Sequence, residues 1–213
     1  MNIVLFGATG MIGRRIAAEA VQRGHHVVAA SRSGEAPLNH ALLTDAAVDA
    51  SSPGQVADVV RGADVVVSAL VPPRDGSDPR KPFVALNEAF LKGVREGGVR
   101  RVVVVGGAGS LLTDGGTRLM DAPGFPAEYK GEALAHADLL DVLAEVTDLE
   151  WTSVSPAAVI APGERTGVFR TGGDRLITDA EGNSAISAED YAVAFVDELE
   201  RAAHPRARMS VAY

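Results

Sequence analysis

Short runs of apolar, often β-branched residues alternate along the chain with longer stretches in which apolar residues recur every three or four positions. The first pattern predicts buried strands, and the second predicts helices with one buried face. The expected strands are residues 3–6, 27–30, 46–49, 64–70, 101–105, 151–155 and 209–212. The expected helices are 11–23, 55–61, 83–96, 129–146 and a last helix capped by Ser187 with Asp190 in the capping-box position.

This alternation of strands and helices predicts an α/β fold. Right-handed crossovers between successive strands give a Rossmann-type, doubly wound parallel sheet. We expect one domain over residues 1–213, with substrate-side elements mainly in 156–190. The loops 71–82, 106–126 and 156–174 all follow strands, so they are expected to gather at the carboxyl edge of the sheet, where ligands bind in such folds.

Composition and charge narrow the function. The chain has no cysteine, which excludes disulfides and thiolate chemistry, and none of its five histidines has a partner at metal-ligand spacing. The net charge of −8 and the absence of any long Lys/Arg cluster argue against a nucleic-acid partner. No leader or membrane-spanning run is seen, so we expect a cytoplasmic monomer or homodimer acting on a small molecule.

Three glycines, Gly7, Gly10 and Gly13, lie between the first strand and the first helix. Residues without Cβ allow a sharp turn and a close approach of a diphosphate, which the exposed amides of the helix start then bind. The alternative is a tight turn with glycine for steric reasons only. The spacing resembles that of the short-chain and extended dehydrogenase/reductase superfamily. The predicted cofactor contacts in this loop are Gly7, Thr9, Gly10, Met11, Ile12 and Gly13.

The end of the second strand indicates which dinucleotide binds. NAD-binding proteins of this fold carry an acidic residue there for the ribose 2′-hydroxyl. Here the residues are Ser31, Arg32 and Ser33, and a guanidinium flanked by hydroxyls suits a 2′-phosphate. The sequence therefore favours NADP(H). Arg32 as a plain surface residue is the alternative, and the nearby Glu35 keeps NAD(H) open.

Fold analogy assigns further cofactor contacts to the ends of the next strands. Asp49 and Ala50 are expected beside the adenine, and Ala69 and Leu70 beside the ribose and diphosphate. Gly106 and Gly107 follow the strand at 101–105 and are expected to line the same edge of the sheet.

The short-chain reductases that the glycine loop resembles carry a catalytic serine followed by Tyr-x-x-x-Lys. This chain departs from that pattern. Ser110 and Tyr129 fit the first two positions, but Ala133 stands where the lysine is expected. Lys130 is adjacent to the tyrosine yet about 100° away around a helix. We take Tyr129, Lys130 and Ser110 as the catalytic candidates, while His136 lies two helical turns beyond Tyr129 on the same face. The missing lysine argues against an alcohol dehydrogenase or an epimerase and favours hydride transfer to an acceptor that stabilises its own charge, such as a flavin, a quinone or a linear tetrapyrrole.

Five stretches of the chain carry a family resemblance, namely GATGMIG, VVVVGGAGSLL, PAEYKGEALAHADLL, WTSVSPAAVIAPGERTG and ISAEDYAVAFVDELE. Together they resemble the NmrA-like, NAD(P)H-binding group of atypical short-chain reductases, often called NADH-flavin reductases. The chain is also similar in plan to biliverdin-IX-beta/flavin reductase.

The resemblance implies the fold, a nicotinamide cofactor and a reductase activity. It also implies that the turn of Ser155, Pro156 and Ala157 passes the nicotinamide, and that residues 162–167 form a substrate-side loop. In that loop Arg165 either meets an anionic substrate or pairs on the surface. Some relatives in this group bind dinucleotide as regulators, so a non-catalytic NADP(H)-sensing regulatory protein is the alternative function.

Overall fold

The computed structural model describes all 213 residues. Its centre is an eight-stranded sheet with the order β3-β2-β1-β4-β5-β6-β10-β8, in which only β8 runs antiparallel to its neighbour. The strands are β1 Asn2–Phe6, β2 His26–Ser31, β3 Leu43–Ala47, β4 Val65–Ser68, β5 Arg101–Val105, β6 Glu150–Ser155, β8 Arg170–Gly172 and β10 Ala207–Ala212. The first six strands have the Rossmann order, which confirms the predicted fold class.

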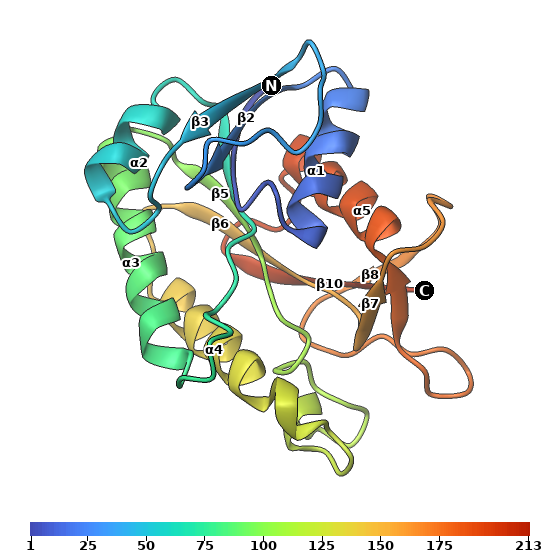
Figure 1. Ribbon diagram of the computed structural model, residues 1–213. Helices are drawn as coiled ribbons and strands as arrows, with labels where there is room; N and C mark the ends of the chain where they lie inside the picture. The colour runs from blue at the N-terminus through green and yellow to red at the C-terminus, as the bar shows by residue number, and fades with distance from the viewer.

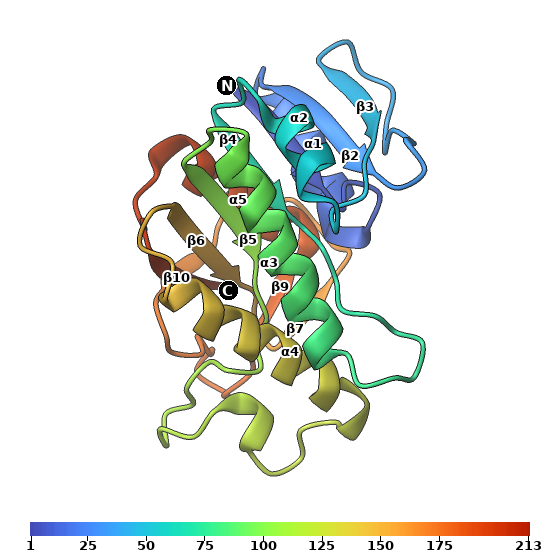
Figure 2. The same ribbon diagram turned by 90° about the vertical axis from the view of Figure 1, so that its left-hand side faces the viewer.

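Helices cover both faces of this sheet (Figure 1). They are α1 Met11–Gln22, α2 Pro53–Val60, α3 Arg80–Glu96, α4 Ala127–Ala144 and α5 Ala188–Arg201, with a short 3₁₀ helix η1 at Leu119–Asp121. Helices α1 and α5 pack together on one face, and Figure 2 shows α3 and α4 side by side on the other, where α2 also packs on α3. None of these helices combines the length and the apolar character that a membrane crossing requires.

The valine runs of the inner strands are explained by burial on both faces. On β4, Val65 and Val67 pack into the core beneath α1 and α5, while Val66 packs into the core beneath α2, α3 and α4. Successive side chains of a strand point to opposite faces, so a strand covered on both sides has no polar position to alternate with.

The loop predicted at 156–174 contains regular structure that the sequence does not indicate. Strand β7 at Val159–Ala161 pairs with β9 at Ala185–Ser187 in a small parallel sheet, and β8 joins the edge of the main sheet. These strands have three residues each, and β7 and β8 contain no buried residue, so no apolar alternation marks them. The predicted cap of α5 is confirmed, because the Ser187 hydroxyl accepts a hydrogen bond from the Asp190 amide at 2.9 Å.

Candidate functional site

The glycine loop lies where the strand order reverses, between the ends of β1 and β4. Gly7 has a φ of +76°, and a Cβ there would lie 2.3 Å from the Ala69 carbonyl oxygen. A Cβ on Gly13 would lie 2.1 Å from the Gly7 carbonyl oxygen. Both glycines are therefore needed to bring α1 against the two strand ends. Gly10 differs, because its Cβ would come no closer than 3.4 Å to the Gly7 oxygen.

The amino terminus of α1 is open to an anion. Gly10 is its N-cap and supplies no side-chain hydrogen bond, and the first turn contains no acidic residue. The amides of Met11, Ile12 and Gly13 have no acceptor in the protein, since the first amides of a helix have no intrahelical partner. Free amides together with the positive end of the helix dipole suit a diphosphate.

Two arginines without ion-pair partners flank this loop. Arg32 is exposed at the end of β2, beside Asp49. Arg14 lies in the first turn of α1, and its Nη2 donates to the Thr9 carbonyl oxygen at 2.8 Å. A positive site thus forms on a protein of net charge −8. The sequence analysis did not include Arg14 among the cofactor contacts. Its position directly after the third glycine, Gly13, is the signal that could have identified it.

The predicted adenine side is formed by the ends of β2 and β3. The Ser31 hydroxyl accepts from the Glu35 amide at 3.2 Å, and the Ser33 hydroxyl lies 3.5 Å away from it. Hydrogen bonds from Ser51, and then the nearby charge of Arg32, lower the pKa of Asp49. The structure therefore brings both serines and Arg32 together beside Asp49, while Ala50 is buried.

The other predicted contacts follow β4, β5 and β6, so they meet at the same edge. Ala69 is buried against Gly7, and Leu70 is partly buried. A Cβ on Gly106 would lie 2.6 Å from the Ser153 hydroxyl, and one on Gly107 would lie 2.8 Å from the His136 Cβ. At the end of β6, Ser155, Pro156 and Ala157 are all buried, so their side chains are not open to a ligand.

No hydrogen bond joins the three catalytic candidates to one another. The Lys130 ammonium donates to the Met120 carbonyl oxygen and, at 2.7 Å, to Asp121. The Ser110 hydroxyl accepts from Arg208 at 2.8 Å. These contacts tie the long loop after β5 to α4 and β10. Tyr129 is 60% exposed and is the candidate whose side chain is left open to a ligand.

The missing lysine has a steric explanation. Ala133 is buried, and a Cβ added to Gly109 would lie only 2.5 Å from the Ala133 Cβ. The loop after β5 therefore packs directly onto this position of α4. A longer side chain at position 133 would displace that loop.

His136 lies under the same loop. Its ring packs edge-on against Phe83 with a centroid distance of 5.0 Å. Burial lowers its pKa to about 4, so the imidazole is neutral at physiological pH. The structure thus places this histidine of α4 at the carboxyl edge of the sheet, between α3 and the residues that follow β5.

The expected substrate-side loop at 162–167 is fastened to α1 and α5. Arg165 makes a bidentate ion pair with the buried Glu19, with both distances 2.8 Å. The amide of Gly163 donates to Glu189 and that of Gly167 to Asp190, both at 2.7 Å. Arg165 is therefore committed to a carboxylate of the protein and is not available to an anionic substrate.

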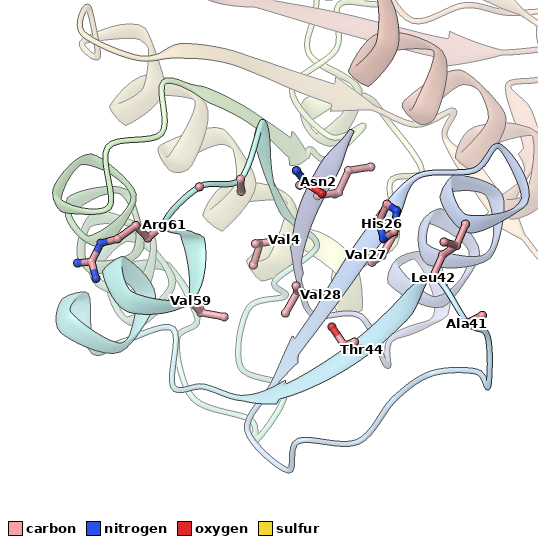
Figure 3. A pocket seen from close by; sticks show the side chains of 13 residues that line it. Asn2, Val4, His26, Val27, Val28, Ala41, Leu42, Thr44, Val59 and Arg61 are labelled. Carbon is pink, nitrogen blue, oxygen red and sulfur yellow. The ribbon is translucent and has the colours of Figure 1, made fainter.

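A hollow of about 280 Å³ lies elsewhere, at the amino ends of β1 and β2 (Figure 3). Its walls are mainly apolar, with side chains such as Val4, Val28 and Val59. It lies at the opposite edge of the sheet from Gly7 and has no convergent set of polar groups. The chemistry of the glycine loop is therefore separate from this hollow.

A comparison with known families decides the identity. Residues 7–202 match a family described as NAD(P)H-binding. The chain belongs to this NAD(P)H-binding family. The match spans the glycine loop, the long loop after β5 and α5, and it confirms the resemblance to the atypical, NmrA-like short-chain reductases.

Three solved structures are similar to the chain over its full length. A candidate exported protein from Burkholderia pseudomallei is 52% identical, with a TM-score of 0.89 and 100% of each chain covered. A candidate epimerase from Bacteroides thetaiotaomicron is 38% identical, with a TM-score of 0.91 and 100% and 96% covered. A candidate NADH-flavin reductase from Streptococcus pneumoniae TIGR4 is 35% identical, with a TM-score of 0.83 and 100% and 99% covered. Together with the family, they support an NAD(P)H oxidoreductase in general terms.

Proposed function

We propose that this protein is an NAD(P)H-dependent reductase that prefers NADPH and transfers hydride to a conjugated small acceptor such as a flavin or a quinone. One observation carries the proposal. An open helix terminus at the glycine loop occurs together with a buried alanine, Ala133, at the position of the usual lysine. The chain keeps the cofactor loop but lacks the group that activates a tyrosine for strong acid–base work.

The choice of acceptor follows from charge. When bound, a reduced nicotinamide supplies the hydride. Both cations near Tyr129 are already engaged within the protein, Lys130 with Met120 and Asp121 and Arg74 with Glu132, so neither is free to hold a simple alkoxide. An acceptor that delocalises the new charge over its own conjugated system does not need that cation.

Turnover assays test the proposal directly. NADPH absorbance is followed with FMN, FAD and small quinones in turn, and each rate is compared with that of the same mixture without protein. We expect turnover above this background with at least one acceptor. Tight NADP(H) binding in calorimetry with no turnover would instead favour the NADP(H)-sensing regulator. The absence of binding would overturn both functions.

The preference for NADPH gives a prediction for Arg32. Arg32→Gln is expected to weaken NADPH binding about 10- to 100-fold, because a charge-assisted hydrogen bond contributes about 1.5–3 kcal/mol. NADH, which has no 2′-phosphate, is expected to bind the variant as it binds the native protein. Calorimetric titration with both cofactors measures the ratio.

Arg14→Gln is the matched control for Arg32, since both side chains are exposed and without ion-pair partners. Arg14 lies at the glycine loop, so its loss is expected to weaken NADPH and NADH binding by the same factor. An unchanged NADPH-to-NADH ratio in Arg32→Gln would show that the 2′-phosphate does not bind there.

We assign to Tyr129 the transfer of a proton to the reduced acceptor. Lys130 and Ser110 are assigned a positioning role, because their hydrogen bonds hold the loop after β5. Tyr129→Phe is expected to lower kcat about 10²-fold with a quinone, whose reduced form needs an added proton. Binding of NADPH is expected to stay unchanged. Glu128→Gln, the exposed neighbour, is the control. If Tyr129→Phe keeps the native kcat, solvent supplies the proton.

The cytoplasmic location, the absence of nucleic-acid partners and the monomeric or homodimeric state stay predictions from the sequence. Analytical ultracentrifugation of the purified chain measures the oligomeric state.

A further inference from the structure

His136 packs between the first turn of α3 and the loop that follows β5, at the carboxyl edge of the sheet. It lies in the third turn of α4, against the Phe83 ring of α3 and directly beneath Gly107. A Cβ on Gly107 would lie 2.8 Å from the Cβ of His136 and 3.1 Å from its Cγ. The ring is therefore held in place by packing on two sides.

The two ring nitrogens have different surroundings. Nδ1 is fully enclosed and has no hydrogen-bond partner, whereas Nε2 also lacks a protein partner but is not enclosed. A proton on Nδ1 would be a buried donor without an acceptor, which proteins rarely tolerate. We therefore assign the proton to Nε2, which leaves a neutral N–H donor open to a ligand.

The charged groups that face this ring do not reverse its neutrality. They are Glu132 on α4 and Arg74 in the loop after β4, and burial is the dominant influence on the histidine pKa, which it lowers. Arg74 and Glu132 also pair with each other in a bidentate ion pair at 3.1 and 2.9 Å. Their opposite charges offset each other at His136. A neutral imidazole donates a hydrogen bond but keeps its proton.

The loop after β4 and the start of α4 flank this donor. Arg74 joins the two, its charge interacts with Tyr129, and Pro79 of the same loop packs where Gly131 has no side chain. Tyr129 and His136 are two helical turns apart on the same face of α4, with Glu132 between them in the sequence. Both lie beyond the strand ends at which the family's cofactor is expected.

We propose that the Nε2–H of His136 donates a hydrogen bond to a carbonyl oxygen of the acceptor. This inference rests on the proposed reductase function and narrows its substrate class to planar conjugated carbonyl compounds, such as quinones and flavins. The acceptor gains two electrons with the hydride, and negative charge collects on that oxygen. A proton from Tyr129 completes the reduction, while His136 stays neutral throughout. A donor aimed at the developing charge stabilises the transition state more than the ground state.

Two substitutions separate the hydrogen bond from the packing. His136→Phe keeps an aromatic ring against Phe83 but removes the donor, and it is expected to lower kcat with a small quinone about 10- to 100-fold. His136→Gln keeps an N–H donor and is expected to recover part of that loss. In both variants the Kd for NADP⁺ is expected to stay within about twofold of the native value, since the His136 N–H is proposed to contact the acceptor and not the nicotinamide cofactor. Thermal unfolding verifies that each variant is folded.

Two further measurements do not depend on turnover. The ¹⁵N shifts of His136 are expected to show the Nε2–H tautomer, with no protonation between about pH 6 and 8. Fluorescence titration with FMN and with a quinone is expected to give weaker binding for His136→Phe than for His136→Gln.

The outcomes distinguish this inference from the proposed function. If the native protein reduces no acceptor, the reductase proposal fails, and the tautomer and the titrations still decide whether His136 binds carbonyl compounds. If the native protein is active but His136→Phe keeps its kcat and acceptor KM, His136 serves packing alone and the inference is overturned. An Nδ1–H tautomer overturns it as well.

Discussion

Gly13→Ala is expected to abolish useful cofactor binding and to destabilise the protein. The added Cβ would lie 2.1 Å from the Gly7 carbonyl oxygen and 3.0 Å from the Ala8 Cα. Both are backbone atoms, so the contact cannot be relieved by rotating a side chain. The start of α1 would have to move away from β1. Such overpacking costs about 1–3 kcal/mol in unfolding free energy.

The loss of affinity follows from the same displacement. The free amides of Met11, Ile12 and Gly13 are the predicted donors to the diphosphate, and they would move with the helix. Each hydrogen bond to a charged group contributes about 1.5–3 kcal/mol. Losing one or two of them lowers NADP(H) affinity about 10²-fold or more, which isothermal titration calorimetry measures.

Gly54→Ala in α2 is the matched control, because it is also a helical glycine but has no atom within 4 Å of its added Cβ. It is expected to stabilise the protein by up to about 1 kcal/mol through helix propensity and to leave cofactor binding intact. Gly10→Ala separates the two roles of the loop. Its Cβ meets only the Gly7 oxygen at 3.4 Å, so the fold is expected to persist while the space for the diphosphate is reduced. Native affinity in both Gly10→Ala and Gly13→Ala would contradict the assignment of this loop.

The fold could be predicted from the sequence because its signals are local. The valine runs, the glycine loop and the Ser187 cap each depend on residues that are neighbours in the chain. The edge strand β3 shows the limit: it runs over Leu43–Ala47 rather than 46–49, and only Leu43 of its residues is buried. An edge strand with one buried residue has little apolar pattern to read.

The parts of the site that escaped prediction depend on contacts between distant residues. Arg165 pairs with Glu19 across 146 residues, and Arg208 donates to Ser110 across 98 residues. Neither partner is visible in a local pattern, so the sequence alone left Arg165 open to a substrate and Ser110 open to catalysis. His136 had a helical position in the sequence, but its burial under Gly107 and its unpartnered Nδ1 appear only when α3, α4 and the loop after β5 are packed together.

A buried ion pair lies at the opposite edge of the sheet, and losing one of its partners is expected to be costly. Arg101 on β5 donates to Glu198 on α5 at 2.6 Å, and both residues are buried. Glu198 also accepts from Thr152 at 3.1 Å and from the His204 ring at 2.7 Å. One carboxylate thus links β5, β6, α5 and the segment leading to β10.

Glu198→Gln is expected to lower the unfolding free energy by about 3–5 kcal/mol, because it leaves the Arg101 guanidinium buried without its counter-charge. For a chain of this size that corresponds to a fall of about 10 °C in the thermal midpoint. Asp148→Asn is the matched control. Asp148 makes a bidentate pair with Arg95 at 2.7 and 3.0 Å, but it is 57% exposed. Its loss is expected to cost no more than about 1 kcal/mol.

The same carboxylate makes stability depend on acid pH in a defined direction. Burial opposes the charge of Glu198, but hydrogen bonds from His204 and the charge of Arg101 outweigh it, so the pKa of Glu198 lies below its ordinary value of 4.5. A lowered folded-state pKa means that the unfolded chain binds the proton more tightly. The contribution of the Glu198 carboxylate to the unfolding free energy is therefore complete above pH 4.5 and is lost as the pH falls below that value through the folded-state pKa.

Glu198→Gln removes this titrating group, so the thermal midpoint of the variant is expected to fall less steeply between neutral and acid pH than that of the native protein. Parallel curves for the two proteins would show that Glu198 does not titrate with unfolding and that the Arg101 pair contributes little.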